Sequence, residues 1–141
     1  MSSMRSFLDT NVLVYCFIDG ESKKRTKARG LVRAALSTHS AIISYQVVQE
    51  FLNVAIRRPQ QHMNQAEAQA YLSKVLMPLC EVFPDPSLYS TALSIAGETN
   101  WSFYDCLIVS SALAGGCDTL FTEDLQDGRV IRDLTVRNPF V

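Results

Sequence analysis

The chain has 141 residues, of which 48% are hydrophobic and 19% are charged, and its net charge at pH 7 is −1. This balance predicts a single globular domain over residues 1–141, and it excludes a disordered chain or a strongly basic polyanion-binding protein. Because the apolar stretches are too short to cross a bilayer, we expect no membrane association and a cytoplasmic location.

The apolar pattern predicts strands and helices that alternate along the chain. Short apolar runs predict strands at residues 5–9, 40–44, 80–84, 118–122 and 134–140. Amphipathic or capped segments predict helices at 22–37, 45–57, 64–77, 86–98 and 103–114. Residues 11–17 fit either a continuation of the first strand or a short helix, 19–24 are predicted to form a loop, and Pro78 is expected to end its helix. This alternation is typical of an α/β fold with a mainly parallel central sheet and helices on both faces.

The four cysteines favour packing over chemistry. They show no C-x-x-C spacing, and each lies in or beside an apolar segment. We therefore expect buried, reduced thiols, and neither a disulfide framework nor a zinc site.

Four of the 14 acidic residues occupy positions where parallel sheets form sites. Asp9 and Asp124 directly follow predicted strands, Asp105 lies in the first turn of the helix at 103–114, and Glu50 lies mid-helix at the margin of an apolar face. Each has an ordinary structural alternative: an Asx turn, an exposed helix residue, a helix cap together with Ser102, or a loop acid. Together, they can converge at the carboxyl edge of a doubly wound sheet.

Converging carboxylates repel one another unless some are protonated or a cation is bound. Mg²⁺ suits such a cluster, because it prefers oxygen ligands and keeps several waters. No histidine or cysteine accompanies the four acids, which argues against zinc.

Four segments carry a resemblance to a known family. "FLDTNVLVY" at 7–15, "QVVQEFLNV" at 46–54, "WSFYDCLIVSSALAGGCDTLFTEDLQDG" at 101–128 and "VRNPF" at 136–140 resemble PIN-domain ribonucleases of the VapC-type toxin group. Their order and spacing agree over essentially the whole chain. The resemblance implies a PIN-like three-layer α/β/α fold.

Carried over position by position, the family's catalytic acids correspond to Asp9, Glu50, Asp105 and Asp124. The resemblance implies that Asp9, Asp105 and Asp124 bind metal, with Glu50 as a further ligand or a hydrogen-bond acceptor behind it. Thr10 and Thr122 match family residues that line the site. Two neighbouring acids compete with Asp124 for the fourth position: Glu123 and Asp127.

The resemblance further implies an endoribonuclease that depends on Mg²⁺ or Mn²⁺. It implies a toxin of a toxin–antitoxin pair, with a small cognate antitoxin as partner, and a homodimer. One alternative is a non-catalytic binding module of the same fold, and the presence of all four acids argues against it. A nuclease directed at DNA stays open, because nothing in the sequence reads a 2′-hydroxyl group.

Contacts to the RNA substrate require hydrogen-bond donors and positive charge. Ser102 is a candidate donor to the scissile phosphate or to a metal-bound water, and its alternative is a helix cap. Arg25 and Arg29 lie four residues apart on the helix at 22–37, where they form either an RNA track or a solvated face.

Overall fold

The computed structural model describes residues 5–17 and 22–141, and its centre is a six-stranded sheet with the order β3-β2-β1-β4-β6-β5. The strands are β1 (Ser6–Leu8), β2 (Ala41–Ser44), β3 (Cys80–Val82), β4 (Thr119–Phe121), β5 (Val130–Ile131) and β6 (Leu134–Arg137). All neighbouring pairs are parallel except β5 with β6. The predicted mainly parallel sheet is therefore confirmed.

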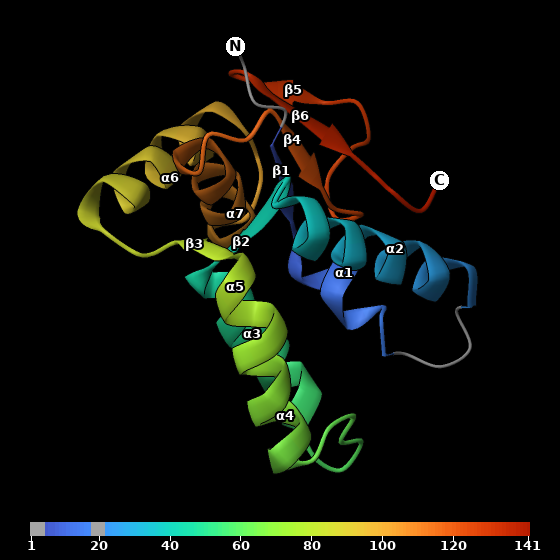
Figure 1. The fold of residues 1–141 in the computed structure, drawn as a ribbon. Coiled ribbons are helices and arrows are strands. Elements are labelled where there is room, and N and C mark those ends of the chain that lie inside the picture. Colours follow the sequence, from blue (N-terminus) through green and yellow to red (C-terminus); the bar gives the residue numbers. More distant parts are fainter. Residues whose placement is uncertain (1–4, 18–21) are drawn as a thin grey trace.

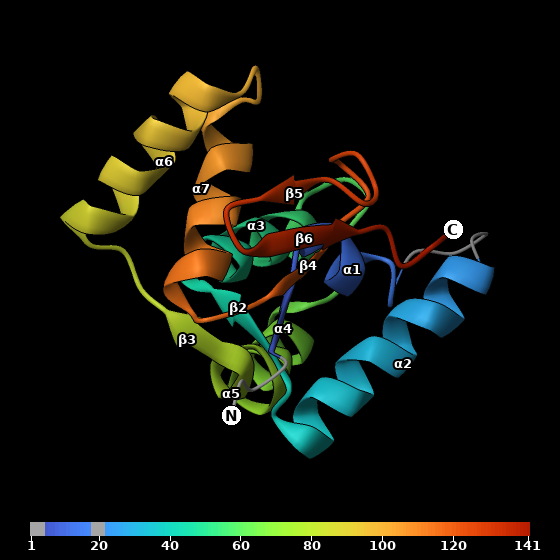
Figure 2. The same cartoon turned by 90° about the horizontal axis from the view of Figure 1, so that it is seen from above.

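Helices lie on both sides of this sheet, as predicted. They are α1 (Thr10–Val14), α2 (Ser22–Thr38), α3 (Tyr45–Ile56), α4 (Gln65–Tyr71), the π-helical segment η1 (Leu72–Leu76), α5 (Met77–Leu79), α6 (Pro86–Glu98) and α7 (Phe103–Ala114). Figure 2 shows α6 and α7 on one side of the sheet and α1 and α2 on the other. Figure 1 shows α3 and α4 side by side, extending beyond the sheet. None of the helices in the described ranges combines the length and hydrophobicity that a membrane span requires.

The structure resolves the ambiguous segment at 11–17 in favour of a helix. The Asp9 side chain accepts a hydrogen bond from the Thr10 backbone N–H and caps α1, so the strand ends one residue earlier, at Leu8. Part of the loop predicted at 19–24 is helical, since α2 begins at Ser22; residues 18–21 lie outside the described part of the chain.

Pro78 does not end its helix, contrary to the prediction. The π-helical segment η1 interrupts the regular bonding pattern, so Pro78 falls in the first turn of α5. Proline is tolerated in a first turn, because a backbone N–H group there has no carbonyl partner within the helix. The chain leaves the helix one residue later, after Leu79. The antiparallel strand β5 was not predicted, because its two residues give no periodic signal.

Helix α7 is the most deeply buried helix segment near the sheet. Every residue from Cys106 to Ala112 is buried. The two buried serines are satisfied by backbone carbonyls: Ser110 donates to Leu88 and Ser111 donates to Leu107, each at 2.8 Å. The four cysteines are free and buried, as predicted. A helix fixed on all sides in this way gives its first turn a defined position relative to the sheet.

Gly115, which ends α7, is expected to tolerate no side chain. A Cβ atom there would overlap Ile42 Cδ1 and lie 3.2 Å from Val82 Cγ2, and Ile42 is fully buried. Gly115→Ala should therefore lower the free energy of unfolding by about 1–3 kcal/mol through overpacking. Urea denaturation followed by circular dichroism measures this loss.

Gly30 provides the matched control, because nothing lies within 4 Å of a Cβ atom at this position inside α2. Gly30→Ala should raise the free energy of unfolding by roughly 0.5–1 kcal/mol, since alanine favours the helix. Equal effects of the two substitutions would show that the contact at Gly115 is not tight.

Candidate functional site

The candidate site lies where the strand order reverses. From β1 the chain proceeds to β2 and β3 on one side, whereas β4 and β6 lie on the other. Leu8 pairs with Phe121, and the Asp9 N–H donates to the Phe121 carbonyl at 3.0 Å. The residues that follow β1 and β4 are therefore neighbours, in the position where open α/β sheets bind ligands.

Asp9 is held at this edge in a nearly solvent-free environment. Its side chain is 7% exposed; Oδ1 accepts from the Thr10 N–H and Oδ2 accepts from the Thr122 hydroxyl, both at 2.7 Å. Burial raises the pKa of Asp9 to about 6, although the bonds from Thr122 and Thr10 act in the opposite direction. The negative charges of Asp124 and Glu50 add to the increase, so both carboxylates lie near Asp9.

Glu50 is connected to Asp9 through Thr10. The Thr10 hydroxyl donates to Glu50 Oε1 at 2.6 Å, and the Gln46 side-chain amide donates to Glu50 Oε2 at 3.2 Å. Gln46 stands one helical turn before Glu50 on α3, and its amide also donates to the Tyr104 carbonyl at 3.4 Å. This second bond connects α3 to the start of α7, next to Asp105.

Asp124 is held beside Asp9 by Asn11 and Thr122. Its Oδ2 accepts from Asn11 Nδ2 at 3.2 Å, and its backbone N–H donates to the Thr122 hydroxyl at 3.1 Å. Burial is the largest cause that raises the pKa of Asp124, and the negative charge of Asp105 is the next. Glu50 contributes in the same direction, so Asp124 lies close enough to both acids to feel their charge.

Asp105 combines a capped backbone with a free carboxylate. Ser102 caps α7 as predicted, because its hydroxyl accepts from the Asp105 N–H at 3.2 Å. Within the described ranges, no residue donates a hydrogen bond to the Asp105 carboxylate. By contrast, Glu67 at the same position of α4 returns a bond to the Asn64 N–H at 2.9 Å and completes a capping box. The Asp105 backbone therefore serves the cap, whereas its carboxylate stays available to the site.

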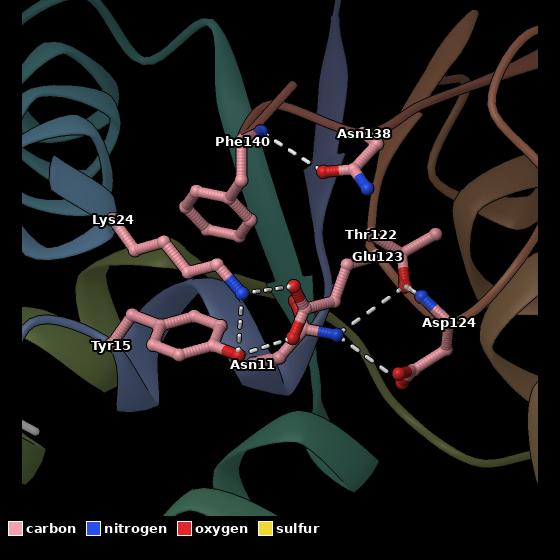
Figure 3. Close-up of polar contacts among 8 residues, drawn as sticks. All are labelled: Asn11, Tyr15, Lys24, Thr122, Glu123, Asp124, Asn138 and Phe140. Atoms are coloured by element: carbon pink, nitrogen blue, oxygen red, sulfur yellow. Dashed lines mark hydrogen bonds and ion pairs between the residues drawn. The ribbon is translucent and has the colours of Figure 1, made fainter. Parts of the chain in front are cut away.

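Asp124 is the one of three competing acids that faces the other carboxylates. Glu123 is turned away toward Lys24, which lies 3.1 Å from its Oε2, and it also accepts a hydrogen bond from the Tyr15 hydroxyl (Figure 3). Asp127 is occupied elsewhere, because its Oδ1 accepts from the Asn138 N–H at 2.8 Å.

The donor chemistry of the cluster fits a hard, hydrated cation. All four acids offer carboxylate oxygens, and the repulsion that raises the pKa of Asp9 and Asp124 is the kind that a divalent ion relieves. Two buried amide oxygens, Asn11 Oδ1 and Gln46 Oε1, have no hydrogen-bond partner although their amide nitrogens bind Asp124 and Glu50. Metal-bound waters would satisfy such acceptors.

The carboxylates do not form a closed cage. Among the described residues, no group of three acidic, histidine or cysteine side chains is already arranged to ligate a metal directly.

The two arginines predicted as substrate contacts are engaged on the surface of α2. Arg29 Nε donates to the Cys16 carbonyl at 3.0 Å and so fixes α2 against the segment after α1. Arg25 also has a partner of its own. These contacts favour the structural alternative for Arg29.

Sequence reasoning missed Asn11, Gln46, Lys24 and Tyr15 as neighbours of the acids. Asn11 and Gln46 had a local signal, since one lies two residues after Asp9 and the other four residues before Glu50. The contacts of Lys24 and Tyr15 with Glu123 span about a hundred residues of sequence and had no such signal.

Solved structures confirm the fold. The chain matches a toxin–antitoxin complex from Klebsiella pneumoniae with a TM-score of 0.67 and 17% identity, over 95% of this chain and 97% of the other. It matches VapBC2 from Rickettsia felis, bound to a DNA fragment of its promoter, with a TM-score of 0.66 and 21% identity, over 96% and 98%. It matches the Mycobacterium tuberculosis toxin VapC20, described as cleaving the sarcin–ricin loop, with a TM-score of 0.59 and 19% identity, over 84% and 91%. At these identities the likeness shows the fold alone.

A family model settles the membership. No curated protein sequence matches the chain significantly. The model of the PIN domain, however, matches residues 6–130, which include β1, β4 and all four acids of the site. The PIN part of the resemblance is thereby confirmed, and the chain belongs to the PIN domain family.

Proposed function

We propose that the protein is a metal-dependent endoribonuclease that hydrolyses RNA phosphodiester bonds, with Mg²⁺ or Mn²⁺ as cofactor, and that it is the toxin of a toxin–antitoxin pair. The observation that carries the chemistry is the gathering of four carboxylates at the β1–β4 edge, where the Thr122 and Thr10 hydroxyls bind Asp9 and Glu50 and the charges of Glu50 and Asp105 act on Asp124. Membership of the PIN domain family supports a nuclease. The biological role is supported by two structural neighbours, a toxin–antitoxin complex from Klebsiella pneumoniae and the toxin VapC20 from Mycobacterium tuberculosis.

Each acid has a defined part in the proposed reaction. Asp9, Asp105 and Asp124 would hold the cation, which when bound lowers the pKa of a coordinated water and stabilises negative charge on the phosphoryl oxygens. The hydroxyls of Thr122 and Thr10 keep the Asp9 and Glu50 carboxylates in place.

Glu50 would orient or deprotonate the attacking water, because both of its oxygens are fixed by single hydrogen bonds and retain further acceptor capacity. In-line attack on the phosphodiester leaves a 5′-phosphate and a 3′-hydroxyl. Ser102 acts through its cap of α7, which fixes the first turn that carries Asp105.

A matched RNA and DNA of the same single-stranded sequence test this proposal. With Mn²⁺ titrated from zero, we expect metal-dependent cleavage of the RNA, 5′-phosphate ends, and no cleavage in EDTA. Efficient cleavage of the DNA alone would support the alternative of a DNA-directed nuclease. No Mn²⁺ binding and no cleavage of either strand would support a non-catalytic binding module.

We propose a second copy of the chain as a further partner, seated on an aromatic surface beside the site. This aromatic surface consists of Tyr45, Phe83, Tyr89, Phe103 and Tyr104, which are between 38% and 66% exposed. Four of them line a cavity of about 260 Å³, and the described residues of that lining include no lysine or arginine. A large aromatic patch without positive charge suits a protein partner better than a phosphate backbone.

Polar substitutions on the aromatic surface are therefore expected to weaken self-association. Phe83→Ser combined with Tyr104→Ser should raise the dimer dissociation constant by at least about tenfold, since buried aromatic side chains dominate interface energies. Sedimentation velocity over a range of concentrations measures this change. Val130→Ser is the control, because Val130 is 60% exposed on β5 and does not line the cavity. A wild-type chain that stays monomeric at all concentrations contradicts the homodimer.

A further inference from the structure

Glu123, the residue before Asp124, belongs to a cluster of four side chains. Its members come from separate segments: Tyr15 follows α1, Lys24 lies in the first turn of α2, Glu123 follows β4, and Phe140 lies near the C-terminus. The Lys24 ammonium lies 3.1 Å from Glu123 Oε2 and 3.3 Å from the Tyr15 hydroxyl, which itself donates to Glu123 Oε1. We call this set of contacts the Glu123 anchor (Figure 3).

Aromatic rings fix the geometry of the anchor further. The Lys24 ammonium lies 4.8 Å from the centre of the Tyr15 ring and 5.8 Å from that of Phe140. These two rings contact each other edge to face, with centroids 5.0 Å apart. An isolated ion pair at a surface contributes little. Here the same ammonium has a carboxylate, a hydroxyl and two ring faces as partners, so its position is restricted from several directions.

The anchor acts on a short loop that carries two residues of the site. Thr122 donates to Asp9, Asp124 donates its N–H to Thr122, and Glu123 lies between them. The loop belongs to no helix or strand, so few backbone contacts fix it. Figure 3 shows the Glu123 side chain extending toward Lys24 and Tyr15, whereas the Asp124 carboxylate lies next to the Asn11 side chain.

The loop needs such a restraint, because electrostatic repulsion acts on Asp124. Its carboxylate shares this edge with those of the other acids and is held by a single hydrogen bond, from Asn11 Nδ2 at 3.2 Å. Without a tether, the exposed Asp124 side chain would move away from the other acids, toward water.

We propose that Tyr15 and Lys24 are positioning residues, which hold Glu123 and thereby fix Asp124 at the metal site. This inference rests on the proposed function of Asp124 as a metal ligand. Glu123 then serves to position the loop. It does not bind the metal, although its place in the sequence made it a competitor of Asp124 for that role.

The sign of the change in metal affinity on removing the Lys24 charge tests this positioning role. Lys24 is a cation near the site, so a purely electrostatic role would oppose metal binding, and Lys24→Met would then tighten it. A positioning role predicts the opposite sign. Tyr15→Phe changes no charge and keeps the ring, yet removes the hydroxyl that donates to Glu123, so it is expected to weaken metal binding as well.

The measurement is Mn²⁺ binding to the full chain without RNA, followed by electron paramagnetic resonance. We expect Tyr15→Phe and Lys24→Met each to weaken Mn²⁺ binding by about 3- to 10-fold, in the range seen for residues that orient metal ligands. Lys24→Arg should retain near wild-type affinity, because it keeps the ion pair. Arg132→Gln is the matched control, since it removes a 2.6 Å ion pair with Glu98 on α6.

The outcomes separate this inference from the proposed function. If the wild type does not bind Mn²⁺, or Asp124→Asn binds it as well as the wild type, the proposed function of Asp124 fails. If Asp124→Asn loses the metal, but Tyr15→Phe and Lys24→Met bind it at least as tightly as the wild type, the anchor is overturned. Melting temperatures within a few degrees of the wild type show that each variant is folded. If Lys24→Met does not fold, the Mn²⁺ affinity of Tyr15→Phe alone decides the result.

Discussion

Asp105→Asn is expected to lower RNA cleavage by at least about 100-fold while the fold stays intact. The substitution removes one of three proposed metal ligands, and the metal contributes several kcal/mol of transition-state stabilisation, each 1.4 kcal/mol of which corresponds to about tenfold in rate. Initial rates on a labelled single-stranded RNA, measured over a range of Mn²⁺ concentrations, give the loss. Growth after induced expression gives an independent reading, since the wild type should arrest growth and the variant should not.

The fold should survive because the structural role of Asp105 lies in its backbone. The Ser102 hydroxyl accepts from the Asp105 N–H, and asparagine keeps that group. The variant loses a favourable carboxylate–helix interaction of about 0.3–1 kcal/mol, and the relief of repulsion on Asp124 offsets part of this loss.

Glu67→Gln is the control for Asp105→Asn, because Glu67 occupies the same position of α4 with its carboxylate bound to the Asn64 N–H. It should cost a similar amount of stability and leave cleavage unchanged. Cleavage by Asp105→Asn at nearly the wild-type rate would leave the residue with the helix cap alone.

The sheet and the gathering of the acids could be predicted because their signals are local. Strand ends, helix caps and apolar periodicity are each visible within a few residues, and Ser102 caps its helix where the sequence indicates. In a parallel sheet, the carboxyl ends of adjacent strands meet at one edge. Asp9 and Asp124 were therefore expected to be neighbours before any geometry was known.

The supporting contacts could not be predicted, because they depend on distant pairs. Nothing near Lys24 or Tyr15 indicates Glu123, since their meeting depends on how α2 lies against the loop after β4. The same limit left Glu123 and Asp127 as competitors of Asp124 in the sequence. Asp127 is engaged outside the site, where it accepts from the Asn138 N–H.

Local competition explains the predictions of secondary structure that failed. Because the π-helical segment η1 precedes α5, Pro78 lies in the first turn of a new helix. The low helix propensity of proline alone does not indicate this arrangement. The segment after β1 was ambiguous because the same apolar residues suit a strand or a buried helix. The Asp9 cap decided between them in favour of α1.

Asp9→Asn is expected to abolish cleavage and, in the absence of metal, to stabilise the protein at neutral pH. Burial raises the pKa of Asp9 to about 6 from an ordinary value of 3.8, so the folded state binds the proton more tightly than the unfolded state. This stabilisation is fully present below the unfolded pKa and disappears as the pH rises through 6. The wild type should therefore lose about 2 kcal/mol from this group between pH 4.5 and 7.5.

Asparagine does not titrate, so the variant should lack that dependence. Urea denaturation in EDTA across this pH range, compared between the two proteins, isolates the contribution of Asp9. Asp118→Asn is the control, because Asp118 precedes β4 at the opposite end of the strand and accepts from Thr119. The difference in unfolding free energy should move in favour of Asp9→Asn with increasing pH, and Asp118→Asn measures the effect of removing a carboxylate outside the site.

Mn²⁺ should reverse the order of stability. A cation that binds the folded wild type stabilises it in proportion to the logarithm of its concentration, and a variant without the ligand gains nothing. Above pH 6 the wild type would then carry an ionised, buried Asp9. This carboxylate destabilises the metal-free protein and binds the cation in the metal-bound protein. Parallel pH profiles of the two proteins in EDTA, or equal stabilisation of both by Mn²⁺, would contradict this account of Asp9.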